Sequence, residues 1–134
     1  MSFVLDASIA ATWAFEDENH PDAALALARL QTDSARVPSV WWFELRSALL
    51  VNERRGRLIE AGTAVFLRDL GRLAISIDRS PDGTAVLTLA RRYRLTVYDA
   101  AYLELAQREG LPLASLDGAL RAATTASGVA LLGA

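Results

Sequence analysis

The hydrophobic positions of this chain fall into short apolar runs separated by longer amphipathic stretches. A short apolar run bounded by turn residues is typical of a buried strand, whereas apolar residues spaced three and four apart indicate a helix. The apolar runs predict strands at residues 3–5, 36–38, 74–77, 113–115 and 129–132. The residue before Pro38 is held in an extended conformation, which supports the second of these strands.

The amphipathic stretches between the apolar runs predict helices. In the longest of them, Trp41, Leu45 and Leu49 share one helical face, and Ser39 stands where a capping residue is preferred. Gly56 and Gly110 each follow such a stretch, where glycine provides the left-handed turn that ends a helix. The predicted helices cover residues 8–15, 22–30, 39–55, 60–73, 81–94, 99–109 and 118–125.

This alternation of strands and helices predicts an α/β fold. Parallel strands joined through helices form a central sheet with helices packed on it, here a sheet of about five strands. No linker, repeat or low-complexity segment interrupts the pattern, and 134 residues are an ordinary length for one domain. We therefore expect residues 1–134 to form a single domain.

The composition narrows the setting in which such a domain would work. The hydrophobic fraction is 52%, yet no apolar run approaches the ~20 residues of a membrane-spanning helix. The N-terminus lacks the basic and apolar regions of a secretory signal. The absence of cysteine excludes disulfides and thiolate metal sites. We expect a cytoplasmic protein with no membrane segment.

The charged residues argue against several classes of function. A net charge of −2 is unlike the basic surface of a protein that coats nucleic acid. All 14 basic residues are arginine, with no lysine. A phosphate-binding P-loop and a Schiff-base mechanism both require lysine, so both are excluded.

Four carboxylates occupy positions where an α/β fold binds its ligands, beyond the carboxyl ends of the strands. Asp6 ends the first predicted strand, and Asp117 follows the fourth. Glu44 lies early in the helix after the second strand, and Asp99 opens a later helix. Carboxylates gathered at one rim repel each other, and a divalent cation such as Mg²⁺ relieves that repulsion. A metal site at this rim is the hypothesis that follows.

Each of these acids also has a simpler interpretation that the sequence leaves open. Asp6 and Asp99 suit helix N-caps, and Asp117 with Gly118 suits a turn. Glu44 has the weakest alternative of this kind, because it stands among aromatic and aliphatic residues, where an unpaired carboxylate is rare.

Three further acids are set aside. Asp78 also follows a strand, but that strand is expected at the edge of the sheet. Asp82 follows a proline and has the character of a helix start. Glu104 lies just over one helical turn beyond Asp99, at a position expected to face solvent rather than to support the site.

Two other families gather acids at the ends of parallel strands. A response-regulator receiver domain places a lysine beside its acids, and a haloacid-dehalogenase-like phosphatase uses both a lysine and a D-x-D motif. This chain has no lysine, and its first strand leads into Asp6, Ala7 and Ser8. Neither family fits.

The segments around the four acids, taken together, resemble a known family. FVLDASIAATW, WWFELRSALL, LTVYDAAYLELA and LPLASLDGAL are similar to the motifs of PIN-domain ribonucleases, and more narrowly of VapC-type toxins from bacterial toxin–antitoxin pairs. The similarity extends from Phe3 to the closing SGVALLGA. Each motif is weak alone, whereas four in this order form a specific match.

The resemblance implies a PIN-like three-layer α/β/α fold and a metal-dependent endoribonuclease. The family's four acids fall on Asp6, Glu44, Asp99 and Asp117. These would be catalytic residues and would bind Mg²⁺, for which Mn²⁺ would substitute, with Glu44 holding a metal-bound water or a second ion. Ser8 and Ser115 match hydroxyl positions expected to orient waters or acids. RNA would be cleaved by a metal-activated water.

The resemblance also implies partners: an RNA substrate, a VapB-type antitoxin that blocks the site, and a second copy in a homodimer. Arginines near the acids are candidate phosphate contacts, namely Arg46, Arg54, Arg55, Arg91, Arg92 and Arg94. Trp13, Trp41 and Trp42 would stack on bases or else pack in the core or against a subunit. A solitary PIN nuclease in RNA processing and a non-catalytic PIN scaffold that binds RNA or protein are the alternatives.

Overall fold

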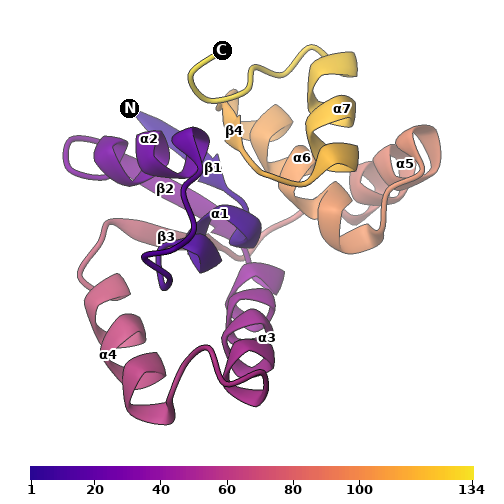
Figure 1. Ribbon diagram of the computed structural model, residues 1–134. Coiled ribbons are helices and arrows are strands. Elements are labelled where there is room, and N and C mark those ends of the chain that lie inside the picture. The colour runs from indigo at the N-terminus through magenta and orange to yellow at the C-terminus, as the bar shows by residue number, and fades with distance from the viewer.

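A computed structural model describes all residues, 1–134, and its elements follow the predicted alternation (Figure 1). The strands are β1 (Ser2–Leu5), β2 (Ser34–Pro38), β3 (Ile75–Asp78) and β4 (Leu113–Ala114). The helices are α1 (Ala7–Thr12), α2 (Pro21–Arg29), α3 (Val40–Arg54), α4 (Glu60–Leu70), α5 (Gly83–Tyr93), α6 (Val97–Glu109) and α7 (Gly118–Ala126). The α/β class predicted from the sequence is confirmed.

The four strands form one parallel sheet in the order β3-β2-β1-β4. Val4 of β1 lies opposite Arg36 of β2 on one side and Leu113 of β4 on the other. Because all strands run the same way, their carboxyl ends meet at one edge, where ligands of such sheets bind. The central strand β1 therefore delivers Asp6 to that edge, and β4 leads toward Asp117 beside it.

The predicted fifth strand at residues 129–132 does not join the sheet, which has four strands. Leu131 forms only an isolated parallel bridge with Leu113. Gly128 and Gly133 enclose the segment with φ angles of 81° and 83°, so the chain turns at both ends of it. The neighbouring strand β4 contains two residues, which leaves too short an edge for continued pairing.

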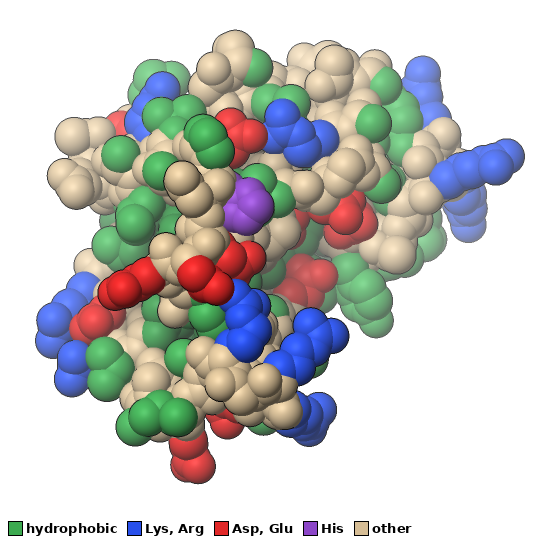
Figure 2. All heavy atoms as spheres, in the orientation of Figure 1, with side chains coloured by type: hydrophobic (Ala, Val, Ile, Leu, Met, Phe, Trp, Pro, Cys, Tyr) green, Lys and Arg blue, Asp and Glu red, His purple; other side chains and the backbone are tan.

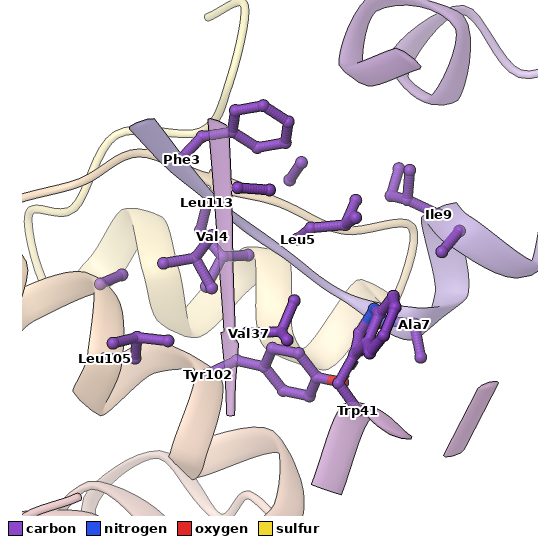
Figure 3. Packing of buried hydrophobic residues seen from close by; sticks show 14 of the residues in the cluster. Phe3, Val4, Leu5, Ala7, Ile9, Val37, Trp41, Tyr102, Leu105 and Leu113 are labelled. Carbon is purple, nitrogen blue, oxygen red and sulfur yellow. Dashed lines mark hydrogen bonds between the residues drawn. The ribbon is translucent and has the colours of Figure 1, made fainter. Parts of the chain in front are cut away.

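Helices cover both faces of the sheet and make it the middle of three layers (Figure 1). Residues of β1 point alternately to the two faces, as a strand requires. Val4 points toward Leu105 and Tyr102 of α6, whereas Phe3 and Leu5 point to the opposite face (Figure 3). All five side chains belong to one hydrophobic cluster of 27 buried residues. Asp6, at the end of β1, is thus supported by the packed core.

The helix ends mostly follow the predicted signals. Gly110 closes α6 with a φ of 66°. The helix begins at Val97, two residues earlier than predicted, because the Thr96 hydroxyl accepts a 3.0 Å hydrogen bond from the Asp99 backbone N–H. Ser39 stands at the N-cap position of α3 but its side chain makes no capping hydrogen bond. None of the helices is both long enough and apolar enough to cross a membrane.

Candidate functional site

The four candidate carboxylates line one cleft at the carboxyl edge of the sheet. Its volume is about 220 Å³, and its lining residues are Asp6, Ala7, Ser8, Ala11, Glu44, Ala48, Asp99 and Asp117. Figure 2 shows acidic side chains within a hollow between α3 and α7, with basic side chains on the surrounding surface. Residues distant in the sequence therefore come together as the motif spacing suggested.

Asp6 is the most buried of the four, with 5% of its surface exposed. It stands before α1 but makes no capping hydrogen bond. Instead its Oδ2 atom accepts hydrogen bonds of 2.7 Å from both the Ser8 and the Ser115 hydroxyls. Burial raises the pKa of the Asp6 carboxyl, and the two hydroxyls oppose that rise. Asp6 therefore occupies the N-cap position of α1, as its simpler interpretation expects, but its side chain does not cap the helix and faces the cleft and these two serines.

The two serines also hold the loop that carries Asp117. The Ser8 hydroxyl accepts a 3.0 Å hydrogen bond from the Leu116 N–H, and the Ser115 hydroxyl accepts one of the same length from the Asp117 N–H. Ser8 follows β1 and Ser115 follows β4, so each hydroxyl joins a donor and an acceptor from the two loops. Asp6 and Asp117 are thereby fixed relative to one another.

Asp117 caps α7 and lines the cleft at the same time. Its Oδ2 atom accepts a 2.9 Å hydrogen bond from the Leu120 N–H, as expected of an N-cap residue. No hydrogen bond engages its other carboxylate oxygen. The capping bond holds the carboxylate rigidly at a helix N-terminus, while one oxygen remains available to the cleft.

Glu44 depends on a tyrosine that the sequence reasoning did not single out. Its Oε1 atom accepts a 2.6 Å hydrogen bond from the Tyr102 hydroxyl. Burial raises the pKa of Glu44, the Tyr102 hydroxyl opposes the rise, and the charges of Asp6, Asp99 and Asp117 add to it. Tyr102 lies one turn after Asp99 in the YDAAYLELA segment. A tyrosine on the buried face of a helix needs a polar partner for its hydroxyl, and that requirement is the signal by which the sequence could have identified Tyr102.

Asp99 lies half-buried in the first turn of α6. Thr96 caps the helix, so the N-cap interpretation of Asp99 is wrong. Burial raises the pKa of Asp99, and the charges of Asp117 and Asp6 raise it further. The carboxylates therefore repel one another across the cleft, as expected for a site that lacks a counter-charge.

No arginine neutralises any of the four acids, although ion pairs are frequent elsewhere in the chain. The contrast is clearest beside β3, where Arg108 contacts Asp78 at 2.6 Å and Glu104 at 2.7 Å. Glu104 was expected to face solvent, but it is buried and paired. Asp78 does end an edge strand, as predicted. Buried acids outside the cleft have cationic partners, and those inside it have none.

The comparison with known families decides the identity of the fold. Residues 3–125 match the PIN domain family. This chain is a PIN domain. The family that its four motifs resemble is thus confirmed over nearly the whole chain. None of the curated proteins is similar enough in sequence to count as a match.

Several solved structures share this PIN fold. PAE2754 from Pyrobaculum aerophilum superposes with a TM-score of 0.72 at 23% identity, covering 92% of this chain and 84% of that one. VapC20 from Mycobacterium tuberculosis, a sarcin-ricin loop cleaving toxin, gives 0.61 at 12% identity, covering 90% and 94%. FitAcB from Neisseria gonorrhoeae gives 0.58 at 17% identity, covering 98% and 96%. At these identities the likeness is one of fold.

The donor set of the PIN domain's cleft suits a hard divalent cation. Carboxylates and hydroxyls supply only oxygen ligands, which Mg²⁺ prefers. No group of three or more Asp, Glu, His or Cys side chains is arranged to hold one ion. Mg²⁺ typically takes one or two carboxylates directly and reaches others through water, and the cleft fits that mode of binding.

Two of the three tryptophans follow the predicted alternative of packing in the core and do not lie beside the PIN domain's cleft. Trp41 is buried, and the Trp13 indole donates to the Ala23 carbonyl, so both belong to the core. Trp42 is partly exposed, and the Arg46 guanidinium lies 3.7 Å from its ring centre. The exposed rings of Phe43 and Tyr98 border a pocket of about 390 Å³, which Val40, Glu44 and Ser47 also line.

Proposed function

We propose that this PIN domain is a metal-dependent endoribonuclease that hydrolyses RNA phosphodiester bonds with Mg²⁺ or Mn²⁺. The observation that carries the proposal is the contrast in charge compensation. The buried acids Asp78 and Glu104 are paired with Arg108. In the cleft, Asp6, Glu44 and Asp117 have only uncharged hydrogen-bond donors, and no cation pairs with Asp99. A concentration of negative charge with no internal partner calls for a cation from outside.

The residues of the cleft would have two roles, binding of the cation and acceptance of a proton. Asp6, Asp99 and Asp117 would bind the cation directly or through water. Glu44 would hold the attacking water or a second ion, and its raised pKa makes it a better proton acceptor than an ordinary carboxylate. A bound divalent cation supplies a water of lowered pKa and a polarised phosphate. Cleavage would leave a 5′-phosphate and a 3′-hydroxyl.

RNA would approach the acidic cleft with help from arginines outside it. No arginine lines the cleft itself. Arg54 and Arg55 are exposed at the end of α3, and Arg91, Arg92 and Arg94 precede α6. Phosphate contacts of this kind position a nucleic acid without reading its sequence. Residues 1–134 would act as one catalytic domain in the cytoplasm.

A toxin role held in check by a VapB-type antitoxin is the biological setting that we propose for this activity. The support is the motif resemblance to VapC-type proteins together with the fold shared with VapC20, a toxin that cleaves the sarcin-ricin loop. An adjacent reading frame for a small antitoxin, and growth arrest on expression that this antitoxin relieves, would be the expected observations. Growth arrest that the Asp6→Asn variant also causes would contradict the toxin role.

A homodimer is the assembly that we propose for the same chain. Large apolar side chains are exposed along α3 and at the start of α6, namely Phe43, Leu50, Val97 and Tyr98. Phe43 and Leu50 are one heptad apart, so they share a helix face. Exposed apolar surface of this kind marks contact with another protein, and a second copy would cover it on both partners.

The nuclease proposal is tested by cleavage of a structured RNA in the presence of Mn²⁺. Wild type should cleave, EDTA should stop the reaction, and Asp6→Asn or Asp99→Asn should abolish it with the fold intact by circular dichroism. Asp69→Asn serves as a matched control, because Asp69 is exposed and lies outside the cleft. Cleavage that persists in EDTA, or in both cleft variants, would disprove the metal mechanism.

A further inference from the structure

Tyr102 is the largest fully buried side chain of the molecule, yet its hydroxyl lies among acids. The residue projects from α6, and its hydroxyl end points away from that helix toward Trp41 of α3 and Ala7 of α1 (Figure 3). The hydroxyl donates to Glu44 Oε1 at 2.6 Å and accepts a longer, 3.4 Å hydrogen bond from the Ala7 N–H. One phenol therefore contacts two other elements that carry the cleft.

These contacts connect three of the four acids through a single group. Ala7 directly follows Asp6 in the chain, and Glu44 lies on α3. Asp99 precedes Tyr102 by three residues on α6, a spacing that places both on the same helix face. A shift of the phenol would therefore displace the elements that carry Asp6, Glu44 and Asp99. The hydrogen bond from Tyr102 to Glu44 is also the only side-chain hydrogen bond between α6 and α3.

Glu44 has no other hydrogen-bond donor. The negative charges of Asp6, Asp99 and Asp117 repel the Glu44 carboxylate and so raise its pKa. A flexible, half-buried carboxylate under such repulsion would turn toward solvent unless a donor held it. The 2.6 Å separation is typical of a hydroxyl that donates to an ionised oxygen, which is about twice as strong as a neutral hydrogen bond.

A phenol is chemically suited to this position in a way that a cation is not. An arginine beside Glu44 would satisfy the carboxylate but would also place a positive charge where the metal is needed. Burial raises the pKa of Tyr102, and the charge of Asp6 and the bond to Glu44 raise it further, so the hydroxyl keeps its proton. Tyr102 thus orients a carboxylate without neutralising it.

We propose that Tyr102 is a positioning residue that fixes the Glu44 carboxylate in the cleft for metal binding, an inference that rests on the proposed function. Tyr102 occupies Oε1 of Glu44 and leaves Oε2 free for the cation or its water. The donor groups around metal ligands are worth about 10- to 100-fold in metal affinity in other proteins. The Tyr102 hydroxyl should have an effect within that range.

The test is Tyr102→Phe, which removes the hydroxyl and keeps the ring that fills the core. Mn²⁺ binding measured by isothermal titration calorimetry at neutral pH should weaken about 10- to 100-fold relative to wild type. Thermal unfolding should show that the variant is folded under the same conditions. Tyr93→Phe is the matched control, because Tyr93 lies on α5, outside the cleft, and its hydroxyl makes no hydrogen bond to the protein.

A double-mutant cycle with Glu44→Gln separates positioning of Glu44 from a general loss of structure. If Tyr102 acts through Glu44, adding Tyr102→Phe to Glu44→Gln should change the Mn²⁺ affinity little further. An equal loss in both backgrounds would overturn the route through Glu44, and so would an unchanged affinity in Tyr102→Phe. Wild type that binds no Mn²⁺ would overturn the proposed function together with this inference, whereas the other two results would leave the nuclease proposal intact.

Discussion

The Ser115 hydroxyl donates a 2.7 Å hydrogen bond to the Oδ2 atom of Asp6, although the two residues lie 109 positions apart in the chain. This bond crosses from the end of β4 to the end of β1, the two strands that carry Asp117 and Asp6 into the cleft. Ser115 has no exposed surface, so the bond is shielded from water. The same hydroxyl accepts from the Asp117 N–H, which makes it the junction between the two acids.

Ser115→Ala should therefore destabilise the protein. The substitution leaves a buried carboxylate short of one donor, and an unsatisfied buried group of this kind costs about 1–3 kcal/mol. Urea denaturation at neutral pH measures the loss, and Ser115→Thr should retain most of the stability because it keeps the hydroxyl. A free energy of unfolding unchanged in Ser115→Ala would show that the bond contributes nothing.

Much of the fold could be predicted from the sequence, because the hydrophobic pattern records which faces are buried. The strands ending near Leu5, Pro38, Asp78 and Ala114 were predicted within a residue or two. The fifth strand was not correctly predicted, since an apolar run shows burial but not pairing. Leu132 is buried like a strand residue, yet its segment makes only one bridge.

The candidate site could also be predicted only in part. The sequence predicted that Asp6 and Asp117 lie together, because both follow strands and a parallel sheet brings the carboxyl ends of its strands to one edge. Tyr102 was not singled out and Glu104 was wrongly expected to face solvent, since their partners lie far away in the sequence or on a helix face whose direction depends on packing. Glu104 is buried because Arg108, one turn later, pairs with it and with Asp78. Pairing of that kind is decided by three-dimensional contacts.

Removal of one cleft charge should stabilise the metal-free protein at neutral pH. Burial and neighbouring carboxylates raise the pKa values of Asp6, Glu44 and Asp99 in the folded state. An acid whose pKa is higher in the folded state than in the unfolded state does not change the free energy of unfolding at a pH below both values. As the pH rises from the unfolded-state pKa through the folded-state pKa, the acid lowers the stability progressively. Asp99→Asn removes one such acid and should add about 1 kcal/mol at pH 7 without metal.

Thermal unfolding in EDTA at several pH values checks this expectation. The advantage of Asp99→Asn over wild type should shrink toward pH 3, where both folded and unfolded carboxyls bind protons. Saturating Mn²⁺ should reverse the order at pH 7, because wild type gains binding energy that the variant lacks. A variant less stable than wild type in EDTA at pH 7 would contradict the account of repulsion in the cleft.

Arg108→Met should be among the most destabilising substitutions outside the cleft. Its guanidinium contacts both Asp78 and Glu104, whose side chains are 6% and 3% exposed. Loss of one partner from a buried ion pair typically costs about 3–5 kcal/mol when the remaining charge stays uncompensated. Glu104 would lose its only cationic partner, whereas Asp78 would keep Arg36 at 3.3 Å. Chemical denaturation gives the change, and the triple variant with Asp78→Asn and Glu104→Gln should recover part of it. If the triple variant is no more stable than Arg108→Met, uncompensated charge is not the cause.

Phe43→Glu should separate a homodimer into monomers. Phe43 is 66% exposed, beside Tyr98 and on the same face of α3 as Leu50, so a charge there would be buried without a partner in a symmetric interface. Light scattering should report the wild-type chain at about twice its 14.5 kDa mass and the variant near 14.5 kDa. Ile59→Glu is the control, because Ile59 is also exposed but precedes α4, away from these residues. A wild-type chain that is monomeric at tens of micromolar would refute the dimer, and a dimer that survives Phe43→Glu would place its interface elsewhere.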